Sequence, residues 1–243
     1  MPTYTEQEWL KTPLGAYLLE QEQALFDSAV SDLFGFNALQ LGMPEIDLLH
    51  NCRIPFRFKA APAGAVTLRC DSAQLPFDAN SVDLLLMPHV LEFSNNPHDA
   101  LREAERILLP EGHLVISGFN PLSLWGIGRL TCKKRGYPWH GKFISLARLK
   151  DWLSLLGFEV SGGRMACYSP PFRSVAWMNR CRFMDRAGDR WWPMMGGIYF
   201  LVAKKRVAGM RLIRPNWNQS RVARALVPRP TQKTKCQKTE HGK

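Results

Sequence analysis

The sequence predicts an α/β domain in which a mostly parallel sheet carries helices on both faces. Short apolar runs of strand length alternate along the chain with amphipathic stretches of helical length, which is the pattern of such a sheet. The chain has 243 residues, 46% of them hydrophobic, and this is enough to bury one full core. Because ligands bind outside the carboxyl ends of parallel strands, we expect functional residues at that edge.

The expected strands are apolar or alternating runs beside turn-forming residues. They lie at 38–41, 56–59, 66–69, 82–87, 113–119, 158–160 and 198–203. The expected helices are amphipathic or, near the N-terminus, interrupted by proline and glycine. They lie at 5–34, 44–50, 97–109 and 146–156. The segments 120–143 and 168–196 break the alternation and are rich in aromatic residues and arginine, so we interpret them as insertions over the ligand edge.

The net charge of +11 is concentrated at the C-terminus. Residues 204–243 contain twelve Lys or Arg and a single acid, whereas acidic and basic residues balance over 1–203. Few apolar residues remain in this tail, so we expect disorder there. The predicted organisation is an N-terminal helical segment (1–34), a domain (35–204) and a basic tail (205–243). The tail would attract nucleic acid or an anionic membrane surface, or it is a solvated extension without a partner.

Several classes of protein do not fit the sequence. Six scattered cysteines without a C-x-x-C pair argue against a disulfide framework. No cluster of histidine and cysteine has the spacing of a zinc site, so we expect no metal. The N-terminal residues lack the apolar core of a secretory signal, and no apolar run reaches membrane-spanning length. The expected location is therefore cytoplasmic.

Residues 70–120 contain four motifs in series. They are Asp71-Ser72 at a strand end, LPF at 75–77, Asp83 opening the next strand, and RILLPEG at 106–112. In order and spacing, this segment resembles the core of the type 11 family of class I S-adenosylmethionine-dependent methyltransferases. The resemblance extends over about 35–204 and is strongest over 70–160. It implies a three-layer Rossmann-like fold with seven strands, the last antiparallel, and S-adenosylmethionine as the cofactor, lying across the ends of the first four strands.

The resemblance also assigns the residues that hold the cofactor. The Asp71 carboxylate would accept a hydrogen bond from the adenine amino group, and the Ser72 backbone would contact the ring. The alternative is that Asp71 only caps the turn before Leu75. The complete cofactor-binding set implied by the resemblance is Gly42, Met43, Asp71, Ser72, Ala73, Met87 and Pro88.

Two places depart from the family pattern. The loop after the first strand is normally rich in glycine, but here Gly42 is followed by Met43 and Pro44, and proline lacks the N–H that could contact the cofactor. The second strand ends in FKAAP (58–62), without the acid that holds the ribose hydroxyls in the family. Losing one hydrogen bond to a charged group weakens binding by about 10- to 100-fold. The sequence therefore predicts a site that binds the cofactor weakly, binds it with altered geometry, or has lost it.

His89 follows the fourth strand at the ligand edge, and the ordinary pKa of histidine suits a general base, so His89 is the candidate catalytic residue. The alternative is a histidine hydrogen-bonded within its loop. Residues 174–186 would form a basic amphipathic lid for a hydrophobic or membrane-associated acceptor, or a helix packed on the core. The leading hypothesis is methyl transfer to a small or lipid-like acceptor. The alternative is an inactive relative of the fold that binds RNA or a protein partner through its tail.

Overall fold

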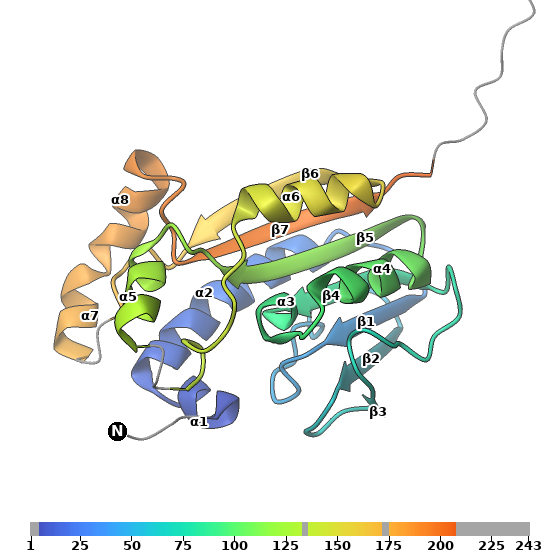
Figure 1. Ribbon diagram of the computed structural model, residues 1–243, viewed down its shortest axis with the longest axis horizontal. Helices are drawn as coiled ribbons and strands as arrows, with labels where there is room; N and C mark the ends of the chain where they lie inside the picture. Colours follow the sequence, from blue (N-terminus) through green and yellow to red (C-terminus); the bar gives the residue numbers. More distant parts are fainter. Residues whose placement is uncertain (1–4, 133–135, 172–174, 208–243) are drawn as a thin grey trace, which may run out of the picture. The chain divides into compact units, whose positions relative to one another are not determined.

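A computed structural model describes residues 5–132, 136–171 and 175–207, and these residues contain one seven-stranded sheet (Figure 1). Its strands are β1 (Asn37–Leu41), β2 (Phe56–Ala61), β3 (Leu68–Arg69), β4 (Val82–Pro88), β5 (Leu108–Phe119), β6 (Phe158–Ala166) and β7 (Ile198–Lys205). The spatial order is β3-β2-β1-β4-β5-β7-β6. Strand β7 runs antiparallel to β5 and β6, and the other neighbouring pairs are parallel. The predicted fold class is confirmed.

Helices cover both faces of this sheet because its central strands are apolar on both sides. The helices are α1 (Glu6–Leu10), α2 (Pro13–Val30), α3 (Val90–Phe93), α4 (Pro97–Ile107), α5 (Leu124–Cys132), α6 (Leu146–Leu155), α7 (Val175–Cys181) and α8 (Phe183–Trp191). In β4, Leu85 packs in the core cluster that includes α4 and α6, whereas Leu84 and Leu86 pack with α2. The alternation of side chains along the strand therefore serves two cores, one on each face.

The structure corrects several expected boundaries. The helix expected at 44–50 does not form, and the whole segment 42–55 consists of turns and irregular backbone. Strand β5 begins at Leu108, so 110–112 lies inside the strand instead of stopping the preceding helix. Pro13 occupies the first turn of α2, because the break between the first two helices falls just before it.

A third core cluster joins the N-terminal helices to the segment 120–143. Trp9 of α1 packs edge-on against Trp125 of α5, with 6.3 Å between ring centroids, and against Tyr137, at 5.4 Å. Leu14 and Leu18 of α2 belong to the same buried cluster. The N-terminal segment is thus packed on the domain. The predicted disordered tail lies outside the described residues, apart from 205–207, of which Lys205 is the last residue of β7.

Candidate functional site

A cavity of about 720 Å³ opens at the carboxyl ends of β1, β2, β3 and β4. This volume is within the range that holds a cofactor-sized molecule. The chain reverses strand order between β1 and β4, the position where α/β sheets bind ligands. The walls come from the strand ends, from α1, from the turn after α3 and from the segment before α6. The lining residues used below are Glu6, Gly42, Met43, Asp71, Ser72, Pro88, His89, Phe93, Tyr137 and His140.

The turn after β1 forms part of the cavity wall and requires its glycine. Gly42 has φ of +87°, and a Cβ at this position would lie 2.9 Å from Val90 Cγ2. Met43 also has a positive φ, of 46°, but its side chain is buried in the third core cluster beside Trp9 and Phe119. Met43 thus belongs to that buried cluster and also lines the cavity.

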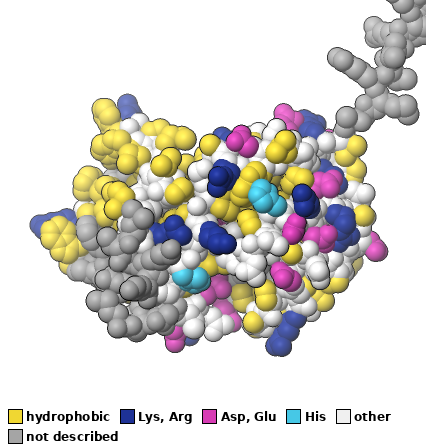
Figure 2. Space-filling view, in the orientation of Figure 1, with side chains coloured by type: hydrophobic (Ala, Val, Ile, Leu, Met, Phe, Trp, Pro, Cys, Tyr) yellow, Lys and Arg dark blue, Asp and Glu magenta, His cyan; other side chains and the backbone are white. Residues whose placement is uncertain are grey.

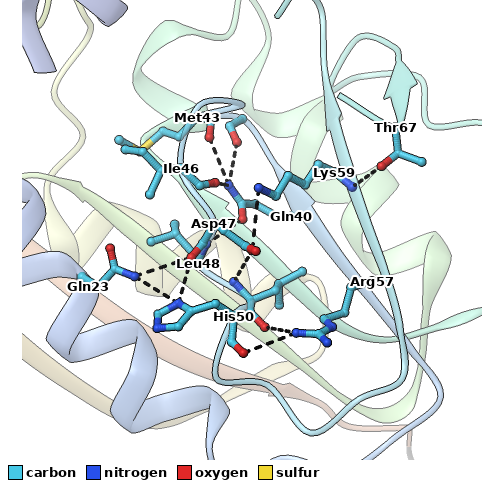
Figure 3. Close-up of polar contacts among 12 residues, drawn as sticks. Gln23, Gln40, Met43, Ile46, Asp47, Leu48, His50, Arg57, Lys59 and Thr67 are labelled. Carbon is cyan, nitrogen blue, oxygen red and sulfur yellow. Dashed lines mark hydrogen bonds and ion pairs between the residues drawn. The ribbon is translucent and has the colours of Figure 1, made fainter. Parts of the chain in front are cut away.

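Gln40 of β1 holds this turn in place (Figure 3). Its buried carboxamide nitrogen donates to the carbonyl oxygens of Met43, at 3.1 Å, and Ile46, at 2.9 Å, while its oxygen accepts from the Leu48 N–H at 3.0 Å. These bonds satisfy backbone groups that a helix would otherwise pair. They explain how 42–55 stays ordered without the helix that follows the first strand in ordinary βαβ units.

Asp71 stands just beyond β3, at the far side of the cavity. Its Oδ1 accepts from the backbone N–H of Ala73 at 3.2 Å and from the Ser72 hydroxyl at 3.3 Å, so it caps the turn as the alternative interpretation required. Its Oδ2 has no hydrogen-bond partner among the described residues. One carboxylate therefore both shapes the turn and keeps an acceptor for a ligand. Ser72 is buried beside it.

His89 lies at the end of β4 in the cavity wall, with its ring between two buried carboxylates. Nε2 is 2.9 Å from Glu22 Oε1 of α2, and Nδ1 is 3.4 Å from Glu92 Oε1 of α3. The ring stacks on Phe119, with 4.1 Å between centroids. Burial alone would lower the pKa of His89, but Glu22 and then Glu92 outweigh it and raise that pKa to about 10. The ring is therefore positively charged at neutral pH.

The N-terminal helix α1 supplies a carboxylate to the cavity. It begins with a capping box in which Thr5 and Glu8 exchange hydrogen bonds, and this fixes the start of the helix at the cavity rim. The Gln7 amide donates to Glu45 Oε1 at 2.8 Å, which ties α1 to the turn after β1. Burial raises the pKa of the Glu6 carboxyl above its ordinary value, against the lowering effect of His89, and Glu45 adds to the rise.

An aromatic wall faces the β4 end of the cavity. Phe93 stacks on Tyr137, with centroids 4.8 Å apart, and lies 5.0 Å from the ring of His140. The Tyr137 hydroxyl is buried and has no hydrogen-bond partner among the described residues. A ligand that fills the cavity would bring that hydroxyl a partner.

The cavity brings together most of the predicted site residues. Gly42, Met43, Asp71, Ser72, Pro88 and His89 all line it. Ala73 is not among its lining residues, and neither is Met87, whose side chain is buried in the sheet core. The end of β2 contributes Ala61 and no carboxylate.

Sequence reasoning missed the contributions of α1 and of the aromatic wall. The signal for α1 was the motif Thr5-x-x-Glu8, which marks a helix start. It indicates nothing about which strand ends the helix will cover. Similarly, 120–143 was expected over the ligand edge, but the pattern did not single out Tyr137.

Comparisons with known proteins agree with this fold. Residues 46–116 match a family model described as a methyltransferase domain. A solved S-adenosylmethionine-dependent methyltransferase from Thermotoga maritima aligns with a TM-score of 0.54 and 17% identity, covering 79% of this chain and 97% of its own. The geranyl diphosphate C-methyltransferase of Streptomyces coelicolor A3(2), solved with Mg²⁺, geranyl diphosphate and S-adenosylhomocysteine, aligns with a TM-score of 0.53 and 15% identity over 79% and 80% of the two chains.

The fold of the described residues is that of the solved S-adenosylmethionine-dependent methyltransferases, whose cofactor is S-adenosylmethionine. Within that fold, residues 46–116 match the type 11 methyltransferase family model. Over 223 residues the chain is 29% identical to the uncharacterized Escherichia coli K12 protein YafS, covering 90% of this chain and 89% of that protein. Among the described residues, no group of three or more His, Cys, Asp or Glu side chains could hold a metal ion.

Proposed function

We propose that this protein transfers a methyl group from S-adenosylmethionine to a small or lipid-like acceptor, with both bound in the cavity at the strand ends. The observation that carries the proposal is the meeting of Gly42, Asp71 and Pro88 around one cavity of about 720 Å³. These residues come from β1, β3 and β4, which the family resemblance assigns to cofactor binding.

In this proposal Asp71 and Ser72 bind the adenine end of the cofactor. The unpaired Oδ2 of Asp71 accepts a charge-assisted hydrogen bond from the adenine amino group, while Oδ1 keeps its hydrogen bond from the Ala73 N–H in the turn. The backbone around Gly42 and Pro88 contacts the rest of the molecule. The carboxylates of Glu22 and Glu92 and the imidazolium of His89 together carry one negative charge. This charge and the Glu6 carboxylate favour a ligand that carries a positive sulfonium.

Methyl transfer from a sulfonium is a direct displacement, so the protein's main task is to align the acceptor. The aromatic wall of Phe93 and Tyr137 suits an apolar acceptor and excludes water from it. His89 would have to lose a proton before it could act as the general base predicted for it. We therefore assign it the role of a fixed positive charge that positions Glu22 and Glu92 beneath the cavity.

Isothermal titration calorimetry with S-adenosylmethionine and S-adenosylhomocysteine tests the proposal. Asp71→Ala removes the adenine acceptor and should weaken binding of both ligands by about 10- to 100-fold. Asp151→Ala removes an exposed carboxylate from α6 and should bind as the wild type does. Absence of binding by the wild type at millimolar ligand would reject the enzyme, and equal affinities of the two variants would reject the adenine role.

The second candidate is an inactive methyltransferase fold that binds RNA or a protein partner through its basic tail. Two observations favour it: no helix follows β1 in 42–55, and β2 ends without a carboxylate to hold the ribose. The calorimetric titration with the two ligands distinguishes the candidates, because only the enzyme must bind the cofactor. Retention on immobilised RNA with no affinity for either ligand would favour the binding module.

A further inference from the structure

The segment that contains α7, α8 and the turn before β7 exposes large hydrophobic side chains to solvent. Six large hydrophobic side chains here are about half or more exposed, and we call them the hairpin patch. They are Trp177 (54%), Phe183 (67%), Trp191 (70%), Trp192 (53%), Met194 (65%) and Met195 (47%). Figure 2 shows hydrophobic side chains gathered over the end of the molecule where Figure 1 draws α8 and α5. Exposed apolar patches of this kind mark interaction sites.

Helix α8 directs its apolar stripe outward, the reverse of a helix that packs on a core. Phe183, Ala187 and Trp191 recur every fourth residue and so share one face, and the two large side chains among them are exposed. Asp185 faces inward instead: its Oδ1 accepts from the Tyr17 hydroxyl at 2.6 Å and from the Tyr168 N–H at 3.0 Å. The acid is used to anchor the helix, and the aromatic residues are left at the surface.

The patch is held in a fixed position on the domain. Gly188 packs so closely on Tyr168 that a Cβ would lie 2.3 Å from its ring, which brings α8 against the end of β6. Met178 of α7 is buried in the third core cluster, and Arg182 pairs with Glu20 of α2 at 2.5 Å. Exposure of the six side chains is therefore a property of the packed structure and not of a frayed end.

Positive charge accompanies the exposed aromatic residues. Arg180 and Arg190 are both exposed, and the Arg180 guanidinium lies 5.8 Å from the centroid of the Trp177 ring. Indole rings locate at the headgroup level of a bilayer, and arginine pairs with lipid phosphates there. We propose that the hairpin patch docks on the surface of a bilayer containing anionic lipids and lies in its interfacial region. Among the described residues, no helix is long and apolar enough to cross a membrane.

Charge favours a lipid surface over the two other occupants that this patch could have. A second copy of the chain would bring the same arginines against each other across a symmetric interface. The chain's own residues 208–243 contain nine Lys or Arg and one acid, so they would be repelled by Arg180 and Arg190 but attracted to the same anionic lipids. This inference does not depend on the proposed methyl transfer.

Vesicle sedimentation of the full-length protein tests it, with phosphatidylcholine alone and with about one third phosphatidylglycerol. The test variant is Phe183→Ser with Trp191→Ser. The control is Phe56→Ser with Leu155→Ser, which removes two exposed hydrophobic side chains from β2 and α6. Both proteins keep the basic tail, so any difference between them belongs to the patch. Each inserted side chain should contribute about tenfold, so the test variant should lose on the order of 100-fold in partitioning and the control less than threefold.

The expected result is strong sedimentation with anionic vesicles, weak sedimentation with neutral ones, and loss in the test variant alone. Unchanged melting temperatures of both variants would show that their folds are intact. Equal partitioning of wild type and test variant would overturn the inference, because the basic tail would then be sufficient for binding to the vesicles. Equal binding to both vesicle types would overturn the requirement for anionic lipid. A dimer seen by light scattering that the test variant loses would identify a second copy as the occupant instead.

Discussion

At the scale of single residues, the charge state of His89 depends on two carboxylates. Glu22 lies far from it in sequence, and Glu92 lies on the next helix. The sequence predicted that His89 follows an apolar strand and lies at the ligand edge. The sequence did not predict its charge state, because the nearer carboxylate, Glu22, belongs to a helix in the N-terminal segment. The ordinary pKa of histidine suggested a base, whereas two buried carboxylates produce a cation. Side chains brought together by packing change the chemistry that a residue type suggests by itself.

The raised pKa of His89 predicts a definite pH dependence of stability. The ring holds its proton up to about pH 10 in the folded chain but only to about 6.5 when unfolded. Its contribution is therefore complete below pH 6.5 and is lost as the pH rises toward 10. Between pH 7 and about 8.5, before thiols titrate in the unfolded chain, the free energy of unfolding should fall by about 1.4 kcal/mol per pH unit. Urea denaturation at several pH values measures this slope.

Glu22→Gln provides the matched variant, because it removes the carboxylate that contributes most to the rise of the His89 pKa. It should cost roughly 3 kcal/mol at pH 7 and flatten the slope above that pH. Glu20→Gln, on the exposed side of the same helix, should keep the wild-type slope. If Glu22→Gln retained the full slope, a different group would be responsible for it.

At the scale of elements, the sequence predicted those parts whose stability comes from their own pattern. The runs at 38–41, 82–87 and 198–203 became strands, because short, mainly apolar runs beside turn-forming residues suit central strands that are buried on both faces. The segment 44–50 did not become a helix, because the Gln40 amide binds the backbone groups that turns leave unpaired. A single buried glutamine has no distinctive pattern in a sequence, so this error could not be avoided by periodicity.

Gln40→Leu tests whether one side chain determines the structure of this loop. It leaves the buried Leu48 N–H and the carbonyl oxygen of Ile46 without the amide partner, while the Met43 carbonyl keeps the Ile46 N–H, and each unsatisfied buried group costs about 1–3 kcal/mol. We expect a loss of about 4 kcal/mol in the free energy of unfolding by urea denaturation. Gln23→Leu is the control, since its amide contacts His50 and Asp47 near the surface and should cost under about 1 kcal/mol (Figure 3). Similar losses in the two variants would show that the loop is held by other contacts.

At the scale of the whole molecule, the N-terminal helices complete both the cavity and the core. Helix α1 brings Glu6 to the cavity rim, and α2 brings Glu22 to His89 and Tyr17 to Asp185. The sequence indicated a helical segment there and a separate domain after it. It could not indicate their packing, because the contacts that join them connect residues that share no local pattern. The family resemblance begins after these helices and therefore did not supply their role.

The end of β2 brings no carboxylate to the cavity, whereas α1 brings Glu6. The contribution of Glu6 to cofactor binding can be measured. Glu6 is a carboxylate in the cavity wall, and S-adenosylmethionine carries a positive sulfonium that S-adenosylhomocysteine lacks. Glu6→Gln should therefore weaken binding of the sulfonium ligand by roughly fivefold while leaving the thioether ligand within about twofold. Because burial raises the Glu6 pKa, this preference should fade as the pH falls and the carboxyl takes up a proton. Calorimetric titration of both ligands distinguishes charge recognition from a general loss of the fold, with Glu20→Gln on the exposed side of α2 as the control. Equal weakening of the two ligands by Glu6→Gln would show that α1 covers the cavity without recognising the charge in it.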